Sequence, residues 1–292
     1  MMKVVFIFIF AVITAYAKPV KIDEILTDKN ELVLDLSVSY HQTTTSENGV
    51  TSITYQTAGG DFVSIPTFIG SGNENIDHLN YGIGIRYGLT KKLELMMSLD
   101  GYSQWSRSFI AGVESEVYGK EFSSLSTALS YEVLKEGKYP ALLLGFSSNV
   151  VERVRFSGDK TKDMNGKNIS LFATSYYTVD PIVFLIQTSF QKFFKKESGD
   201  DVIQTGDVIS LAPEIYFAVN PYTSINWGVQ WIHQKQSRYN DFISEPSSSN
   251  MVHMVGVTYE LDSKTTLVFD TKHQSSASYD QSTLDFKYSY RF

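Results

Sequence analysis

The residues of this sequence that could do chemistry are ionisable side chains alternating with apolar ones in extended runs. Near the end of the chain, Leu284 and Phe286 alternate with Asp285 and Lys287. Successive side chains of an extended chain point to opposite faces, so this pattern predicts a strand with one apolar and one charged face. Similar runs place the following charges on one shared face: Asp35, Arg86, Glu94, Glu132, Glu214, Glu260, Asp270, Lys272, Asp285, Lys287 and Arg291.

In a membrane barrel these charged faces must turn toward the lumen. A charge on the lipid-facing side costs up to about 2–4 kcal/mol at the bilayer midplane. The enclosed charges then line an aqueous pathway for a small solute, or they pair with one another and brace a narrow barrel. Small residues on the same face, such as Gly82, Gly145 and Gly256, leave room for water or for a packed plug. The sequence does not decide between these two interpretations.

Catalytic and metal-binding patterns are weak in this chain. The segment Phe146-Ser147-Ser148-Asn149 has no histidine at a spacing typical of a nucleophile and its base. No His/Asp/Glu cluster has metal-ligand spacing, and the chain has no cysteine. We therefore predict a protein that is not an enzyme and needs no cofactor or metal. A barrel hydrolase would need a serine to meet one of the five histidines near the outer rim: His41, His78, His233, His253 or His273.

Regularly spaced turns position these charged faces. Short turn signals such as Asp180-Pro181 and Asn220-Pro221 recur about every 40 to 47 residues, each between two strand-like runs. Longer polar segments join the other ends of the runs, including residues 42–78 and 102–121. The predicted strands are 31–41, 78–89, 92–102, 122–134, 139–151, 167–179, 182–194, 207–219, 222–234, 250–261, 264–274 and 282–292.

This pattern predicts an all-β protein, a closed antiparallel transmembrane β-barrel of about twelve strands, with short periplasmic turns and long extracellular loops. An even number of strands returns both chain ends to the periplasmic side. A period near 42 also occurs in β-propellers, but a propeller blade packs four short strands into that length. Here each period holds two runs of ten or more residues, which favours the barrel.

The chain begins with an export pattern. Lys3 precedes the apolar run 4–13, and Ala15-Tyr16-Ala17 has the form of a cleavage site, so residues 1–17 are predicted to be a cleaved signal peptide. Residues 18–30 are polar and weakly patterned, which fits a short periplasmic segment or a plug entering the barrel. Residues 31–292 then form the barrel. The predicted location is the bacterial outer membrane.

The chain closes on aromatic residues. Tyr288, Tyr290 and Phe292 alternate to the last position. This ending resembles the C-terminal strand of bacterial outer-membrane barrels, and the resemblance implies an assembly signal read by the barrel-assembly machinery. Other expected partners are outer-membrane lipid and lipopolysaccharide, the latter near Lys195-Lys196 or Arg153 and Arg155. A net charge of −7 argues against a nucleic-acid partner.

A quarter of the chain has a more specific resemblance. The segment 86–95, Arg-Tyr-Gly-Leu-Thr-Lys-Lys-Leu-Glu-Leu, and the segments 125–134 and 139–145 resemble the "MetA-pathway of phenol degradation" family of outer-membrane proteins. The resemblance implies a barrel that passes small, aromatic or hydrophobic molecules. This chain has Asn149-Val-Val-Glu152 where such relatives continue with a Pro-Thr-Gly loop. The expected function is a small-molecule channel; the alternative is an occluded barrel that acts through its extracellular loops.

Overall fold

The computed structural model describes residues 26–45, 49–56, 62–70, 73–110, 113–156, 160–275 and 279–292. The regular elements in these ranges are β-strands. No helix within the described ranges is long and apolar enough to span a membrane. The predicted signal peptide and most of segment 18–30 lie outside the described residues.

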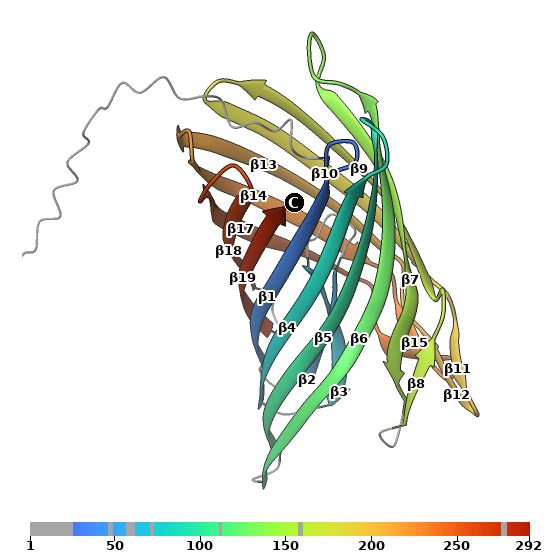
Figure 1. Cartoon of the computed structure of the whole chain (residues 1–292). Coiled ribbons are helices and arrows are strands. Elements are labelled where there is room, and N and C mark those ends of the chain that lie inside the picture. The colour runs from blue at the N-terminus through green and yellow to red at the C-terminus, as the bar shows by residue number, and fades with distance from the viewer. Residues whose placement is uncertain are drawn as a thin grey trace, which may run out of the picture.

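Twelve antiparallel strands close into a barrel, as the alternating pattern predicts (Figure 1). Eleven neighbouring pairs follow the sheet order β6-β5-β4-β1-β19-β18-β17-β14-β13-β10-β9-β7, and the pairing of β6 with β7 completes the ring. The barrel strands are β1 (Leu32–Thr45), β4 (Asn73–Gly88), β5 (Leu93–Ile110), β6 (Val113–Leu134), β7 (Ala141–Arg155), β9 (Asn168–Val179), β10 (Ile182–Phe193), β13 (Val208–Asn220), β14 (Thr223–Gln234), β17 (Ser248–Glu260), β18 (Thr265–Ser275) and β19 (Tyr279–Arg291).

The first and last barrel strands meet along their whole length. The β1–β19 ladder runs from Val33 opposite Arg291 to Thr45 opposite Tyr279. Beyond the ladder, the Phe292 amide donates to the Leu32 carbonyl at 2.9 Å. The chain thus seals its own sheet, so neither β1 nor β19 is left as an unpaired edge.

The two faces of each strand have opposite chemistry. On β13 the outward side chains are Ile209, Leu211, Pro213, Ile215, Phe217 and Val219, all exposed, whereas inward Val208, Ser210 and Ala212 are buried. The outward series from Ile209 to Val219 covers about 33 Å along the strand, or about 25 Å along the axis at a tilt of about 40°. That height matches the apolar belt of a membrane barrel.

The two ends of the barrel differ. Short turns and the C-terminus lie at one end, which we call the turn end (Figure 1, top). At the other end, the rim end, β5 and β6 continue to Ile110 and from Val113, so most of the predicted loop 102–121 is a strand hairpin instead. The sequence pattern did not predict this hairpin, because its residues are polar on both faces. A strand with water on both sides shows no alternation of apolar and polar residues.

Shorter strands complete the rim. The predicted loop 42–78 contains a hairpin of β2 (Gly49–Gln56) and β3 (Phe62–Gly70). A second group is the four-stranded sheet of β11 (Lys196–Ser198), β12 (Asp201–Gln204), β15 (Ser237–Tyr239) and β16 (Phe242–Glu245). The last piece, β8 (Thr161–Met164), pairs antiparallel with the rim end of β7. The segments that follow β7, β10 and β14 therefore build part of the rim with short strands.

Candidate functional site

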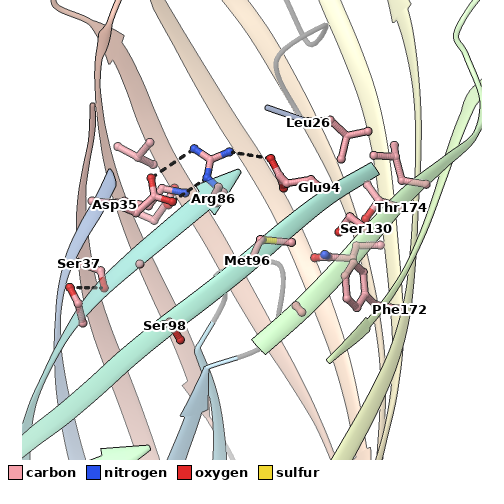
Figure 2. Close-up of a pocket in the computed structure, with 18 of the residues that line it drawn as sticks. Leu26, Asp35, Ser37, Arg86, Glu94, Met96, Ser98, Ser130, Phe172 and Thr174 are labelled. Carbon is pink, nitrogen blue, oxygen red and sulfur yellow. Dashed lines mark hydrogen bonds and ion pairs between the residues drawn. The ribbon is translucent and has the colours of Figure 1, made fainter. Parts of the chain in front are cut away.

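A cavity of about 350 Å³ lies in the barrel lumen (Figure 2). Side chains from most of the barrel strands line it, and the Leu26 side chain reaches it from before β1. Seven of the eleven charged residues singled out in the sequence are among its lining residues: Asp35, Arg86, Glu94, Glu214, Asp270, Lys272 and Lys287.

An ion-pair group forms the turn-end part of the charged wall. Arg86 Nε and Nη2 donate to the two carboxylate oxygens of Asp35 at 2.7 and 3.3 Å. The Ser289 hydroxyl donates to the same carboxylate at 2.6 Å. Figure 2 shows Arg86 between Asp35 and Glu94, whose nearest oxygen is 4.0 Å from Arg86 Nη1. Two parallel N–H···O bonds fix the guanidinium plane, so Arg86 is held rather than free to swing.

Other predicted charges form ion pairs of their own or lie outside the cavity. Lys272 and Asp285 form an ion pair of 3.1 Å between β18 and β19. Arg291 lies 3.5 Å from Glu31 near the turn end. Glu132 and Glu260 stand at the turn-end tips of β6 and β17 and are not part of the cavity lining.

The opposite wall of the lumen is apolar. Ala141, Leu143, Tyr176 and Val183 form a buried cluster on β7, β9 and β10. Nearer the rim, a second inward cluster contains Phe193, Val208, Ala212, Ile232, Val252 and Met254. Charges therefore concentrate on β18, β19, β1, β4 and β5, which are neighbours in the sheet, and apolar side chains concentrate on the facing strands. The lumen is two-sided.

Residues just before the first strand close onto the turn end of this lumen. Leu26 packs against the Leu143 cluster. The backbone amide of Thr27 donates to Glu94 Oε2 at 2.6 Å, and Glu94 is only 1% exposed. The Asn30 amide donates to the Gly88 carbonyl at 2.8 Å. The position of the Leu26 contact could not be predicted, because a single leucine in a polar segment has no periodicity.

The inward glycines make room for neighbouring side chains. An added Cβ at Gly145 would lie 1.9 Å from the Phe172 ring, which covers it from the opposite strand. An added Cβ at Gly256 would lie 1.7 Å from the Asp270 carboxylate. At these points the space beside each glycine is therefore filled by a neighbouring side chain. The lumen thus contains both packed side chains that brace the barrel and an open cavity.

A serine and a histidine do meet, in the rim half of the lumen. The Ser39 hydroxyl contacts His41 Nε2 at 2.8 Å and also donates to Asp285. His41 Nδ1 contacts the Thr283 hydroxyl at 2.8 Å. Asp285 therefore bonds the serine and not the far nitrogen of the histidine, unlike a nucleophile–base–acid relay. Both Ser39 and His41 are almost fully buried.

Metal ligands do not gather in the described part of the chain. No group of three or more His, Asp or Glu side chains there is placed to hold a metal ion.

The ladder between β13 and β14 is interrupted at Pro213. The β13–β14 ladder pairs Leu211 with Trp231, passes over Ala212 and Pro213, and resumes with Glu214 opposite Gly228. Proline has no amide hydrogen to offer a ladder. A largely apolar recess of about 380 Å³ lies here, lined by outward residues such as Trp227 and by inward Leu185 and Glu214. Leu185 and Glu214 also line the lumen cavity.

Several cations that were predicted to contact lipopolysaccharide form ion pairs within the chain. Lys196 points into the barrel and pairs with Glu152 at 2.9 Å, and both side chains are only 5% exposed. Arg153 donates to both oxygens of Asp163 at 2.7 and 2.9 Å. Arg155 donates to Glu121. Three of the cations predicted for that role are thus engaged by carboxylates of the chain itself.

Comparisons with known proteins agree on the fold. No family model and no curated protein matches the sequence. Among solved structures, the chain is similar to an outer membrane channel from Pseudomonas putida F1, with a TM-score of 0.64 and 12% identity over 91% of this chain and 97% of that one. It is also similar to the translocator domain of the autotransporter NalP from Neisseria meningitidis, with a TM-score of 0.55 and 10% identity over 92% and 91% of the two chains. A third similar structure is the transport unit of the autotransporter AIDA-I from Escherichia coli, with a TM-score of 0.54 and 10% identity over 89% and 90%. The chain has the fold of outer-membrane β-barrels.

Proposed function

We propose that this protein is an outer-membrane channel for small molecules that have an apolar, aromatic or aliphatic, body and a polar group. The turn end faces the periplasm and the rim end faces outward, as in bacterial barrels. The observation that carries the proposal is the two-sided lumen cavity. Its volume of about 350 Å³ lies within the range of small-molecule sites, about 300–1,000 Å³.

Each wall has a role in this proposal. The polar group of the solute meets Arg86 and Lys287 on the charged wall, while the body of the solute lies against Leu143, Phe172 and Leu185. The recess at Pro213 supports a solute with an apolar body. It is a largely apolar surface on the membrane side of the barrel, and Leu185 lines both this recess and the lumen cavity.

The test is solute flux in reconstituted vesicles. Liposomes containing the protein should take up a small aromatic carboxylate faster than a disaccharide of similar mass, and Arg86→Gln should reduce that preference. The matched control is Arg107→Gln, which alters an exposed pair with Glu116 on the rim. Equal, protein-independent leakage of both solutes would refute the channel.

The alternative is an occluded barrel that acts through its rim. The observation that favours it is the β5–β6 hairpin, where Trp105 and Tyr118 are exposed and their rings lie 5.7 Å apart. Shortening this hairpin at both strands should abolish surface binding on that proposal and leave flux unchanged. Loss of flux with intact surface binding would favour the channel instead.

A further inference from the structure

Two lysines converge on one carboxylate on the outside of the barrel. Lys192 Nζ lies 3.2 Å from Asp207 Oδ2, and Lys235 Nζ lies 3.3 Å from the same oxygen. The side chains of Lys192 and Lys235 are 44% and 65% exposed. They stand on the two strands that flank β13: Lys192 near the rim end of β10 and Lys235 directly after β14, with Asp207 directly before β13 between them.

These charges begin where the apolar belt ends. Phe190, Ile209 and Trp231 are the last exposed apolar side chains within β10, β13 and β14 on their outward faces, and Phe194, 40% exposed, follows Lys192 just after β10. The next outward position on β10 is Lys192, about 7 Å further along the strand. A side chain at that height lies in the headgroup layer of the outer leaflet, and the face that carries it looks sideways into the membrane.

Cations outnumber the carboxylate in this sector. The Phe194 amide donates to the Lys167 carbonyl at 2.9 Å, which places Lys167 opposite Phe194 and diagonal to Lys192. Lys192 and Lys235 therefore flank Asp207, and Lys167 lies beyond Lys192 on the next strand. The ammonium groups of Lys192 and Lys235 approach one oxygen closely enough for a single phosphate to accept hydrogen bonds from both.

We propose that Lys167, Lys192 and Lys235 bind the phosphate group of a saccharolipid of the outer leaflet, with its acyl chains lying along Phe190, Ile209 and Trp231. Charge complementarity selects an anion, and the location on the outward wall selects one that is anchored in the membrane. The apolar strip directly beneath the cations adds contact area that a free anion cannot use. The site is separate from the lumen, so it does not depend on the proposed transport function.

The experiment is native mass spectrometry of the purified, delipidated protein with lipid A as the probe. The wild type should bind bisphosphorylated lipid A and bind its dephosphorylated form far less. Lys192→Gln/Lys235→Gln should lower the affinity about tenfold or more, since each lysine near an anionic lipid contributes measurably. Lys192→Arg/Lys235→Arg, which keeps both charges, should retain binding.

Controls keep the result interpretable. Lys120→Gln removes an exposed lysine of β6, three strands from β10 in the sheet order, and should bind like the wild type. Heat-dependent migration in a denaturing gel verifies that each variant is a folded barrel. Equal binding by the Lys192/Lys235 glutamine variant, equal binding of dephosphorylated lipid A, or full displacement by millimolar inorganic phosphate would each overturn the proposal.

Discussion

Glu94 accepts a hydrogen bond of 2.6 Å from the backbone amide of Thr27, and this contact ties a residue before the first strand to the inner face of β5. The pair is buried at the turn end, beside Leu26 and the cavity. A charge-assisted bond of this kind contributes about 1.5–3 kcal/mol. It is therefore the natural place to test whether the N-terminal segment is held in the lumen.

The first prediction concerns this bond and uses the absence of native cysteine. In a Thr27→Cys protein the backbone bond is kept, and the buried thiol should react slowly with a maleimide. Adding Glu94→Ala should speed labelling about tenfold or more, the ratio that roughly 1.4 kcal/mol produces. Glu132→Ala, at the tip of β6, is the matched control. Identical labelling rates with and without Glu94 would show that the bond does not hold the segment.

The second prediction concerns the glycine under Phe172. Gly145→Ala places a methyl group where the ring now lies, so the ring must rotate, and stability should fall by about 1–3 kcal/mol. Urea unfolding of the barrel in lipid vesicles measures this. In the double variant Gly145→Ala/Phe172→Ala the clash is gone, so the alanine at residue 145 should cost much less than in the wild-type background. Additive effects of the two changes would contradict the packing described.

The third prediction concerns Pro213. Pro213→Val restores an amide hydrogen where the β13–β14 ladder is interrupted, and should narrow the recess beside Trp227. Uptake of an apolar aromatic solute into vesicles should fall, while uptake of a small hydrophilic ion through the lumen should stay the same. Val219→Ile, another outward substitution on β13, is the control. Equal loss of both fluxes would mean that the change acts on the whole barrel.

The fourth prediction concerns Asp163 on the rim strand β8. Its hydrogen bonds from Arg153 hold the pKa of the Asp163 carboxyl below its ordinary value of 3.8. The ionised form is favoured in the folded hairpin, so this stabilisation is complete above pH 3.8 and is lost as the pH falls through the lowered pKa. A carbon-13 NMR titration of the Asp163 carboxyl should show a midpoint below 3.8, and Arg153→Gln should return it to the ordinary range. A midpoint unaffected by Arg153→Gln would contradict the assignment.

The fifth prediction concerns the aromatic ending, which we propose as an assembly signal. Tyr290 and Phe292 are in edge-to-face contact, with ring centroids 5.0 Å apart, and Phe292 is 61% exposed. A side chain so exposed adds little to packing, so Phe292→Ala should leave the thermal stability of refolded protein nearly unchanged. Insertion into membranes in cells should nevertheless drop severalfold. If stability and insertion fall together, the residue is structural and the signal lies elsewhere.

The sequence predicted one end of the barrel far better than the other. At the turn end, every predicted strand boundary lies within two residues of the structure, because tight turns such as Asp180-Pro181 fix it. At the rim, β6 begins nine residues before the predicted 122, since its polar extension lacks the apolar alternation that lipid imposes.

The candidate site was predicted in its parts but not in its arrangement. Alternation alone assigned Asp35 and Arg86 to the same face, because a strand repeats every two residues. Their pairing across β1 and β4 depends on register, which neither residue reveals. The docking of Leu26 and the grouping of Lys192 with Lys235 depend on contacts between distant segments, and no local pattern carries that information.

The seam between β1 and β19 has a consequence for biosynthesis. The strand that completes the ring, β19, is translated after the other eleven barrel strands, so every product that stops before it keeps two unpaired strand edges with open backbone donors and acceptors. Such edges readily recruit other chains. A nonsense codon within β19 should therefore be as damaging as one in the middle of the barrel, and the nascent polypeptide has to be shielded until β19 has been made.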